Sequence, residues 1–186
     1  MRTIWTAAAA NGKFGAILRL ALLTAQRLDK IASMKWDDVS VDGIWTIPTE
    51  DDREKGHGGN LQLPEMALAV ISEQKRVTGN PFIFPARRRE GHYTGFSRGK
   101  ARLEAQAGAL PRWTIHDQRR TTRSLMARAG VLPHVGERVM GHVQQGVYDR
   151  YDYEHEKADA LAKLAGRIEL ILNPPADNVT ELYAGA

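Results

Sequence analysis

Apolar and polar positions in the first third of the chain predict a buried helix followed by a short hairpin. Residues 17–23 are apolar almost all round, which is typical of a helix enclosed in a core. Residues 43–48 read as a strand that ends at a proline, and residues 61–63 alternate as a second strand. The polar, glycine-rich residues 49–60 lie between them, so we expect an antiparallel hairpin whose tip carries Lys55.

The rest of the chain is predominantly helical in its pattern. Pro64 begins a helix that we expect to run to about residue 77, and the PFIFP run at residues 81–85 predicts a short buried extended piece. Proline stops the last helix after residue 172, and residues 173–186 read as a loose tail. Helices grouped around one small sheet predict an α+β fold that is mainly α. Four further helices are expected, at residues 95–107, 115–129, 133–140 and 154–172.

Composition narrows the class of protein. The 186 residues are 42% hydrophobic and 26% charged, which suits one domain with one core. The absence of cysteine excludes disulfides, thiolate metal sites and cysteine nucleophiles, and it suits a reducing compartment. No apolar run approaches the roughly 20 residues that span a bilayer, and no signal-peptide pattern is present. We therefore expect a cytoplasmic protein without a membrane partner.

Positive charge is concentrated in the middle of the chain. The net charge is +4, but residues 87–128 hold eleven basic residues against three acidic ones, a local charge of +8. Ten of the eleven are arginines, whose planar guanidinium contacts phosphate with two parallel hydrogen bonds. This pattern favours a polyanionic partner such as double-stranded DNA, the alternative being a solubilising surface.

One segment, IHDQRRTTRSLMARAGV at residues 115–131, combines a histidine with four arginines. His116 and Arg119 are three residues apart, so on a helix they project from one face and can meet one ligand. The roles of Arg120, Arg123 and Arg128 stay open between contacts with flanking DNA and pairing inside the protein.

Metal and cofactor sites are not predicted. Six histidines occur without an H-x-x-x-H helix, and the chain has no cysteine ligand. The acidic run at residues 50–52 lacks the spacing and the closing glutamate of a calcium loop. No cofactor and no metal are therefore expected.

Several motifs in order resemble one known family. They are LLTAQRLDKIASMKW, a WTIP strand, a lysine-bearing hairpin, LQLP, FIFP, IHDQRRT, VMGH and VYDRYDYEHEKADAL. Together, over about residues 5–172, they resemble the catalytic domain of a tyrosine recombinase of the phage or genomic-island integrase type. The resemblance implies a site-specific DNA recombinase that cleaves and rejoins strands through a covalent 3′-phosphotyrosine, without metal or ATP, to integrate or excise a mobile element.

The resemblance also predicts the domain organisation and assembly. Residues 1–172 would form the catalytic domain and residues 173–186 a C-terminal tail. Integrases of this kind carry arm-binding and core-binding domains ahead of the catalytic domain, so we expect this chain to be a fragment. A tetramer on DNA is the expected assembly.

An active site of two arginines, a lysine, two histidines and a tyrosine is implied around one DNA phosphate. The first arginine follows the buried helix in a T-x-x-R context that begins at Thr24. Lys30 departs from the family, which commonly has an acidic residue there to orient that arginine, although Asp29 is adjacent. The positions that match the site are Arg27, Lys55, His116, Arg119, His142 and Tyr148.

The chemistry of strand cleavage accounts for these residue types. Arg27 and Arg119 would clamp the two non-bridging oxygens that gather negative charge in the transition state. A phenol with a pKa of about 10 is a poor nucleophile at neutral pH, so His116 would accept or relay its proton. His142 would donate to a phosphate oxygen, and Lys55 would protonate the departing 5′ oxygen. A phosphotyrosine conserves the bond energy, so rejoining needs no ATP.

Two questions stay open at this point. The local context of Tyr148 matches the family nucleophile, whereas the usual spacing of nine residues after His142 falls on Tyr151; we take Tyr148, because loop length varies most easily. The alternatives to a recombinase are a non-catalytic helix-turn-helix DNA-binding module on residues 115–129 and 133–140, and a type IB topoisomerase with the same residue set.

Overall fold

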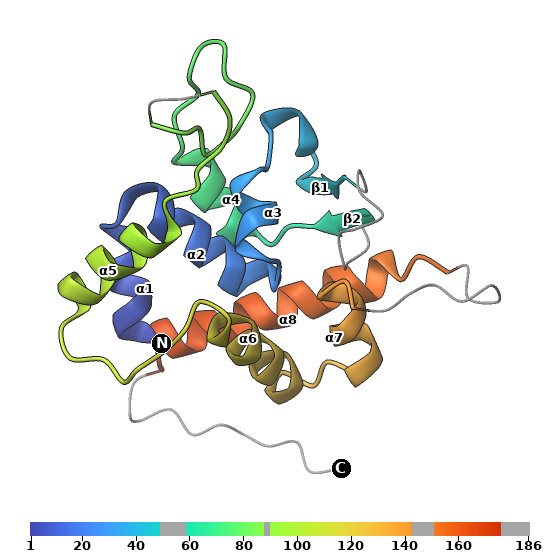
Figure 1. Ribbon diagram of the computed structural model, residues 1–186. Coiled ribbons are helices and arrows are strands. Elements are labelled where there is room, and N and C mark those ends of the chain that lie inside the picture. Colours follow the sequence, from blue (N-terminus) through green and yellow to red (C-terminus); the bar gives the residue numbers. More distant parts are fainter. Residues whose placement is uncertain (49–58, 88–89, 143–150, 176–186) are drawn as a thin grey trace.

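A group of helices with one two-stranded sheet at its edge makes up the computed structural model, which describes residues 1–48, 59–87, 90–142 and 151–175 (Figure 1). The predicted α+β, mainly α class is confirmed. In chain order the elements are α1 (Arg2–Ala9), α2 (Gly12–Thr24), α3 (Leu28–Ala32), the 3-10 turn η1 (Trp36–Asp38), β1 (Ile44–Ile47), β2 (Gly59–Gln62), α4 (Glu65–Ser72), α5 (Phe96–Ala107), α6 (Asp117–Arg128), α7 (Pro133–Val139) and α8 (Glu154–Leu172).

Helix α2 is the centre of the core, as its apolar sequence predicts. Ten of its 13 residues are buried, and it contacts α1, α3, α4, α5, α6 and α8. Two glycines permit the closest of these approaches. A Cβ on Gly15 would lie 1.8 Å from the carbonyl oxygen of Ala8 in α1, and a Cβ on Gly99 in α5 would lie 2.3 Å from the ring of Phe14. Only glycine fits at either contact.

The hairpin is antiparallel, and its strands pair Trp45 with Leu61 and Ile47 with Gly59. Trp45 and Leu61 are both buried, so the strand pair turns one face to the core. Two hydrogen bonds join it to the start of α8: the Nζ of Lys157 donates to the carbonyl of Asn60 at 3.1 Å, and the Asn60 amide donates to Glu154 at 3.0 Å. The base of the hairpin is therefore held against α8.

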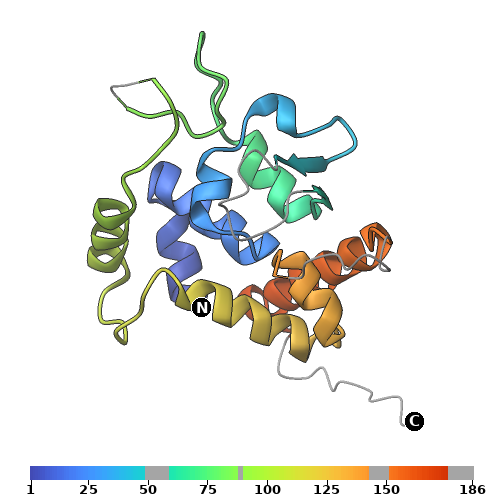
Figure 2. The same cartoon turned by 45° about the vertical axis from the view of Figure 1, so that its right-hand side comes forward.

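Helices α6, α7 and α8 pack together on one side of the molecule (Figure 2). The buried face of α8 consists of Ala160, Leu161, Leu164, Ala165 and Ile168, the periodicity of an amphipathic helix. Within the described residues, no helix combines the length and apolar character that a bilayer span requires.

Element boundaries differ from the sequence expectation where local contacts intervene. Helix α6 begins at Asp117, two residues after the expected start, and residues 115–116 form a turn in front of it, where the Asp117 carboxylate accepts hydrogen bonds from the backbone N–H and the hydroxyl of Thr114. Helix α4 ends at Ser72 rather than near residue 77, since Val77 is 49% exposed and finds no core to pack against. Helix α8 spans the predicted residues. Of the piece at residues 81–85 that was expected to be buried, residues 83–85 are buried, whereas Pro81 is exposed and Phe82 is half-buried.

Candidate active site

Arg119 is the buried charge at the centre of the candidate site. Its side chain lies on α6, is 5% exposed, and is the one charged residue classed as buried in the described part of the chain. Nη2 lies 3.0 Å from the carbonyl oxygen of Met140 and 2.8 Å from Nε2 of His142. Both acceptors belong to the turn after α7, so helix packing brings the predicted second arginine and second histidine together.

The other terminal nitrogen of Arg119 has an unmet hydrogen-bonding demand. Nη1 is shielded from solvent and finds no partner among the described residues. Burial is the main cause that lowers the pKa of Arg119, and the positive charge of Arg27 lowers it further. A buried guanidinium with an unused N–H beside a like charge is unfavourable by itself, and an anionic oxygen between the two arginines would satisfy both deficits.

Arg27 is placed by a tight break between α2 and α3. Ala25 ends α2 in the left-handed conformation with φ 59°, and Arg27 follows as the half-buried residue before α3. The Thr24 hydroxyl bonds back to Leu20, and the buried Gln26 amide donates to the carbonyl of Val139 at the end of α7. The Arg27 turn is thereby tied to the segment that carries His142.

His142 contacts an acidic residue that the sequence analysis did not identify. Its Nδ1 lies 2.8 Å from one carboxylate oxygen of Glu137, and the other oxygen accepts a hydrogen bond from Nε of Arg123 at 2.9 Å. These hydrogen bonds, first that from Arg123 and then that from His142, hold the pKa of Glu137 below its usual value. Hydrogen bonds thus connect four side chains in the order Arg119, His142, Glu137 and Arg123.

His116 lies at the surface. It is the residue immediately before α6, it is exposed, and its side chain makes no hydrogen bond within the described ranges. It is therefore next to the first turn of the helix whose Arg119 is buried, with an imidazole open to an incoming ligand. The sequence expectation that both side chains act on one ligand stays a prediction.

Lys55 and Tyr148 lie outside the described residues. The strand ends on either side of residues 49–58 are described: Ile47 ends β1, Gly59 begins β2, and both line one small hollow together with Gln26 and Gly141. Gln26 precedes Arg27 and Gly141 precedes His142, so Ile47 and Gly59, at the ends of β1 and β2, lie close to the neighbours of two predicted site residues.

Tyr151 and Tyr153, the two tyrosines that directly precede α8, are in unlike environments. Tyr153 packs its ring under the guanidinium of Arg138 at 3.7 Å, with a left-handed backbone at φ 55° where α8 begins. Tyr151 is 54% exposed and contacts the Tyr153 ring at 4.8 Å. The carboxylate of Glu156 is the main cause that raises the pKa of Tyr151, which disfavours the tyrosinate.

The three remaining arginines of α6 divide into one internal and two surface residues. Arg123 is used inside the protein by Glu137. Arg120 pairs with Asp117 at 3.0 Å but keeps its side chain 76% exposed, and Arg128 is exposed at the end of the helix. Arg120 and Arg128 therefore remain available to an external anion. Within the described ranges, no three His, Asp or Glu side chains cluster as metal ligands.

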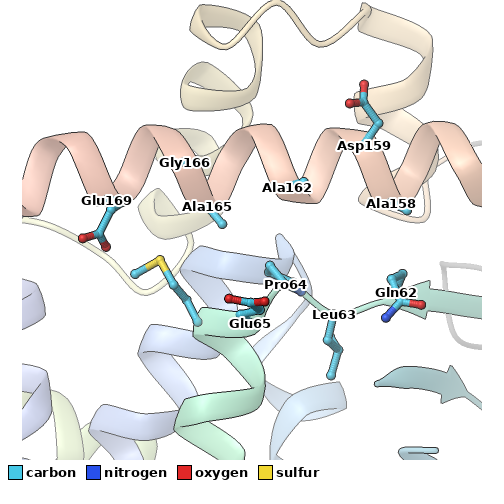
Figure 3. Close-up of a pocket in the computed structure, with 11 residues that line it drawn as sticks. Gln62, Leu63, Pro64, Glu65, Ala158, Asp159, Ala162, Ala165, Gly166 and Glu169 are labelled. Atoms are coloured by element: carbon cyan, nitrogen blue, oxygen red, sulfur yellow. The ribbon is translucent and has the colours of Figure 1, made fainter. Parts of the chain in front are cut away.

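A separate groove of about 660 Å³ lies between α8 and the connection from β2 to α4 (Figure 3). Ala158, Ala162, Ala165 and Gly166 form its α8 side, and Leu63, Pro64 and Met66 are among the residues opposite. None of the four described site residues, Arg27, His116, Arg119 and His142, is among its lining residues, so this groove is separate from the described part of the candidate active site.

Solved structures with the same fold are integrases and a recombinase. The fold is similar to that of the integrase from mycobacterium phage Brujita, with TM-score 0.64 and 18% identity over 90% of this chain and 54% of that one. It is similar to the XerA recombinase, with TM-score 0.63 and 16% identity over 94% of this chain and 63% of that one. A lambda integrase tetramer bound to a Holliday junction matches with TM-score 0.57 and 20% identity over 80% of this chain and 46% of that one.

This chain thus spans about half to just under two thirds of the length of these three structures. No curated protein sequence matches it. None of the similar structures supports the helix-turn-helix or topoisomerase alternatives. The family model described as the phage integrase family matches residues 3–157, most of the sequence. With the fold, the buried arginine and its histidine partner in place, the chain belongs to the phage integrase family.

Proposed function

We propose that the protein is a site-specific DNA recombinase that cleaves and rejoins strands through a covalent 3′-phosphotyrosine, integrating or excising a mobile element. Membership of the integrase family supports this proposal. The observation that carries it is the buried Arg119, which lies close enough to Arg27 for their charges to interact and has an N–H without a partner in the described structure. This is an environment made for one anionic group.

Arg27 and Arg119 would hold the two non-bridging oxygens of the scissile phosphate. Charge builds up on these oxygens as phosphorus becomes five-coordinate, so the two guanidinium groups bind the transition state more tightly than the substrate. Loss of one such donor typically costs about a hundred- to a thousandfold in rate. The clamp is therefore a principal source of the proposed catalysis.

Tyr148 is our proposed nucleophile. Its phenol oxygen attacks phosphorus, the bond from phosphorus to the 5′ oxygen breaks, and the DNA 3′ phosphate becomes attached to the tyrosine. The exposed His116 accepts or relays the phenol proton, and Lys55 protonates the departing 5′ oxygen. His142 donates to a phosphate oxygen in the same complex. Rejoining reverses these transfers without ATP.

The proposed partners are double-stranded DNA and further copies of the protein. One of the similar structures is a lambda integrase tetramer bound to a Holliday junction, and we propose a tetramer on DNA here as well. Exposed Arg120 and Arg128 would contact phosphates that flank the cleaved one. Metal independence follows from the arginines, which supply the positive charge. The cytoplasm, where DNA is accessible, is the proposed location.

A covalent-capture experiment tests this function without a known target sequence. The protein is incubated with a pool of nicked duplexes of randomised sequence, and DNA that stays attached after denaturation in detergent is recovered and sequenced. We expect a protein–DNA adduct and enrichment of a defined site. Binding without an adduct would instead support a helix-turn-helix module. Adducts together with relaxation of a supercoiled plasmid, but without strand exchange between two duplexes, would support a type IB topoisomerase.

A further inference from the structure

The carboxylate of Glu137 occupies a position that the proposed mechanism leaves unexplained. It lies on α7, and its two oxygens accept from different elements, at 2.9 Å from Arg123 on α6 and at 2.8 Å from His142 after α7. The Glu137 side chain is 39% exposed, so the arrangement is set by these hydrogen bonds and not by deep burial. An acid held in this way can orient the imidazole beside it.

Hydrogen-bond chemistry fixes the protonation of His142 in this arrangement. Arginine only donates, so the 2.8 Å contact from Arg119 Nη2 requires a lone pair on Nε2 of His142. An ionised carboxylate only accepts, so the contact with Glu137 requires a proton on Nδ1. The low pKa of Glu137 agrees with an ionised carboxylate. A single neutral tautomer satisfies both contacts.

We infer that Glu137 is a positioning residue, which holds His142 in the Nδ1–H form and aims its Nε2 at the phosphate-binding nitrogens of Arg119. In the DNA-free protein, Nη2 of Arg119 donates a hydrogen bond to Nε2 of His142. An incoming phosphate oxygen takes over Nη2 of Arg119 and releases Nε2 of His142. Because this last step assumes a phosphate ligand, it rests on the proposed function.

Release of Nε2 has a definite chemical consequence. To donate to the phosphate from Nε2 while Nδ1 stays bonded to Glu137, His142 must take up one proton from solvent and become an imidazolium. The carboxylate of Glu137 then balances that charge. Among the described residues, the charged groups around the imidazole are Arg119 and Arg123 of α6 and Glu137 of α7, with Arg138 of α7 and Lys157 of α8 on the hollow that Gly141 lines.

Nitrogen NMR of the 186-residue chain, labelled at histidine, tests the tautomer without any requirement for activity. The His142 signals are assigned by their loss in His142→Gln. We expect a protonated Nδ1 and an unprotonated Nε2 in the free protein. Addition of inorganic phosphate should then protonate Nε2. A proton on Nε2 and none on Nδ1 in the free protein would overturn the inference, and so would a spectrum that phosphate leaves unchanged.

Glu137→Gln removes the charge and keeps the size of the side chain. We expect His142 to lose its single tautomer and phosphate to stop protonating Nε2. Cleavage of the captured DNA site should slow by roughly ten- to a hundredfold, the size expected for one charged hydrogen bond, with affinity for DNA changed by less than about twofold. Glu137→Asp, which restores the charge, should recover part of the rate. An unaltered tautomer in Glu137→Gln would refute the positioning role.

Two further variants separate positioning from stability. Arg123→Gln breaks the other contact of Glu137. It should lower the melting temperature about as much as Glu137→Gln does, while the His142 tautomer stays in place. Glu73→Gln breaks an Arg–Glu pair with Arg19 on α2 and should change neither tautomer nor rate. Failure of covalent capture with the expected tautomer intact would reject the proposed function alone, whereas normal capture with a wrong tautomer would reject only the role of Glu137.

Discussion

The arginine side and the tyrosine side of the site are constructed differently. Arg119 is 5% exposed and is bonded to His142, which is in turn bonded to Glu137. Tyr151, in contrast, is 54% exposed, and a neighbouring carboxylate raises its pKa. The same chain therefore buries and orders the groups that we propose to receive a phosphate, while it leaves the phenol of Tyr151 exposed to solvent and beside negative charge.

This difference matches what the arginines and the tyrosine nucleophile each require. A guanidinium stabilises a transition state best when its position is fixed before the substrate arrives, and fixing it requires the core. A phenol needs positive surroundings to ionise near neutral pH. The surroundings of Tyr151 are the reverse, and Tyr153 is already packed under Arg138. Tyr148 is left as the proposed nucleophile.

The largest expected effect comes from Arg119→Lys, which breaks the arginine side directly. Lysine keeps the charge and loses the two-pronged geometry, so cleavage of a nicked duplex should fall by at least about a hundredfold. Affinity for DNA should fall much less, because many other phosphates are still contacted. Single-turnover cleavage and a DNA-binding titration measure the two effects. Normal cleavage by this variant would mean that Arg119 does not hold the scissile phosphate.

Gln26→Ala tests whether the position of Arg27 depends on the buried hydrogen bond from Gln26 to Val139. The change removes the hydrogen bond to Val139 and leaves a buried carbonyl unpaired, which should lower the free energy of unfolding by about 1–3 kcal/mol. Cleavage should fall about tenfold beyond the effect of stability, since Arg27 is displaced. Gln74→Ala removes a similar bond from the side chain to Val70 and is the control. Equal cleavage by the two variants at equal folded fraction would argue against that dependence.

Glu156→Gln sharpens the tyrosine side of the comparison. Removal of the carboxylate should lower the pKa of Tyr151 toward its ordinary value near 10, because negative charge no longer opposes ionisation. Tyrosinate absorbance is titrated with and without Glu156→Gln, and the signal of Tyr151 in each case is the difference from the matching Tyr151→Phe variant. If Tyr148 is the nucleophile, cleavage stays unchanged. A faster reaction at neutral pH would instead point to Tyr151.

The smallest expected effect is that of a chelator. The arginines supply the positive charge that a metal ion supplies in other DNA-cleaving enzymes, so cleavage should persist in EDTA. Arg119→Lys measured in added magnesium is the matched control and should not recover. Loss of activity in EDTA that magnesium restores would contradict the arginine-based mechanism.

The sequence predicted the helices and strands of this protein better than the side-chain contacts between them. Periodicity and the terminal prolines located α8, and the H-x-x-R spacing selected Arg119 from the many arginines around it. No local pattern indicates that Glu137 and Arg123 meet His142, since these contacts depend on how α6 and α7 pack. The predicted places of Lys55 and Tyr148 fall outside the described residues.

Mapping the covalent adduct tests the central claim most directly. The protein is trapped on a nicked duplex from the enriched pool, digested with protease, and analysed by mass spectrometry for the tyrosine that carries the phosphonucleotide. The account predicts Tyr148, with no adduct from Tyr148→Phe and a normal adduct from Tyr151→Phe, since each change removes one oxygen and keeps the ring. A phosphonucleotide on Tyr151 would contradict the assignment, and the absence of any tyrosine adduct would contradict the mechanism.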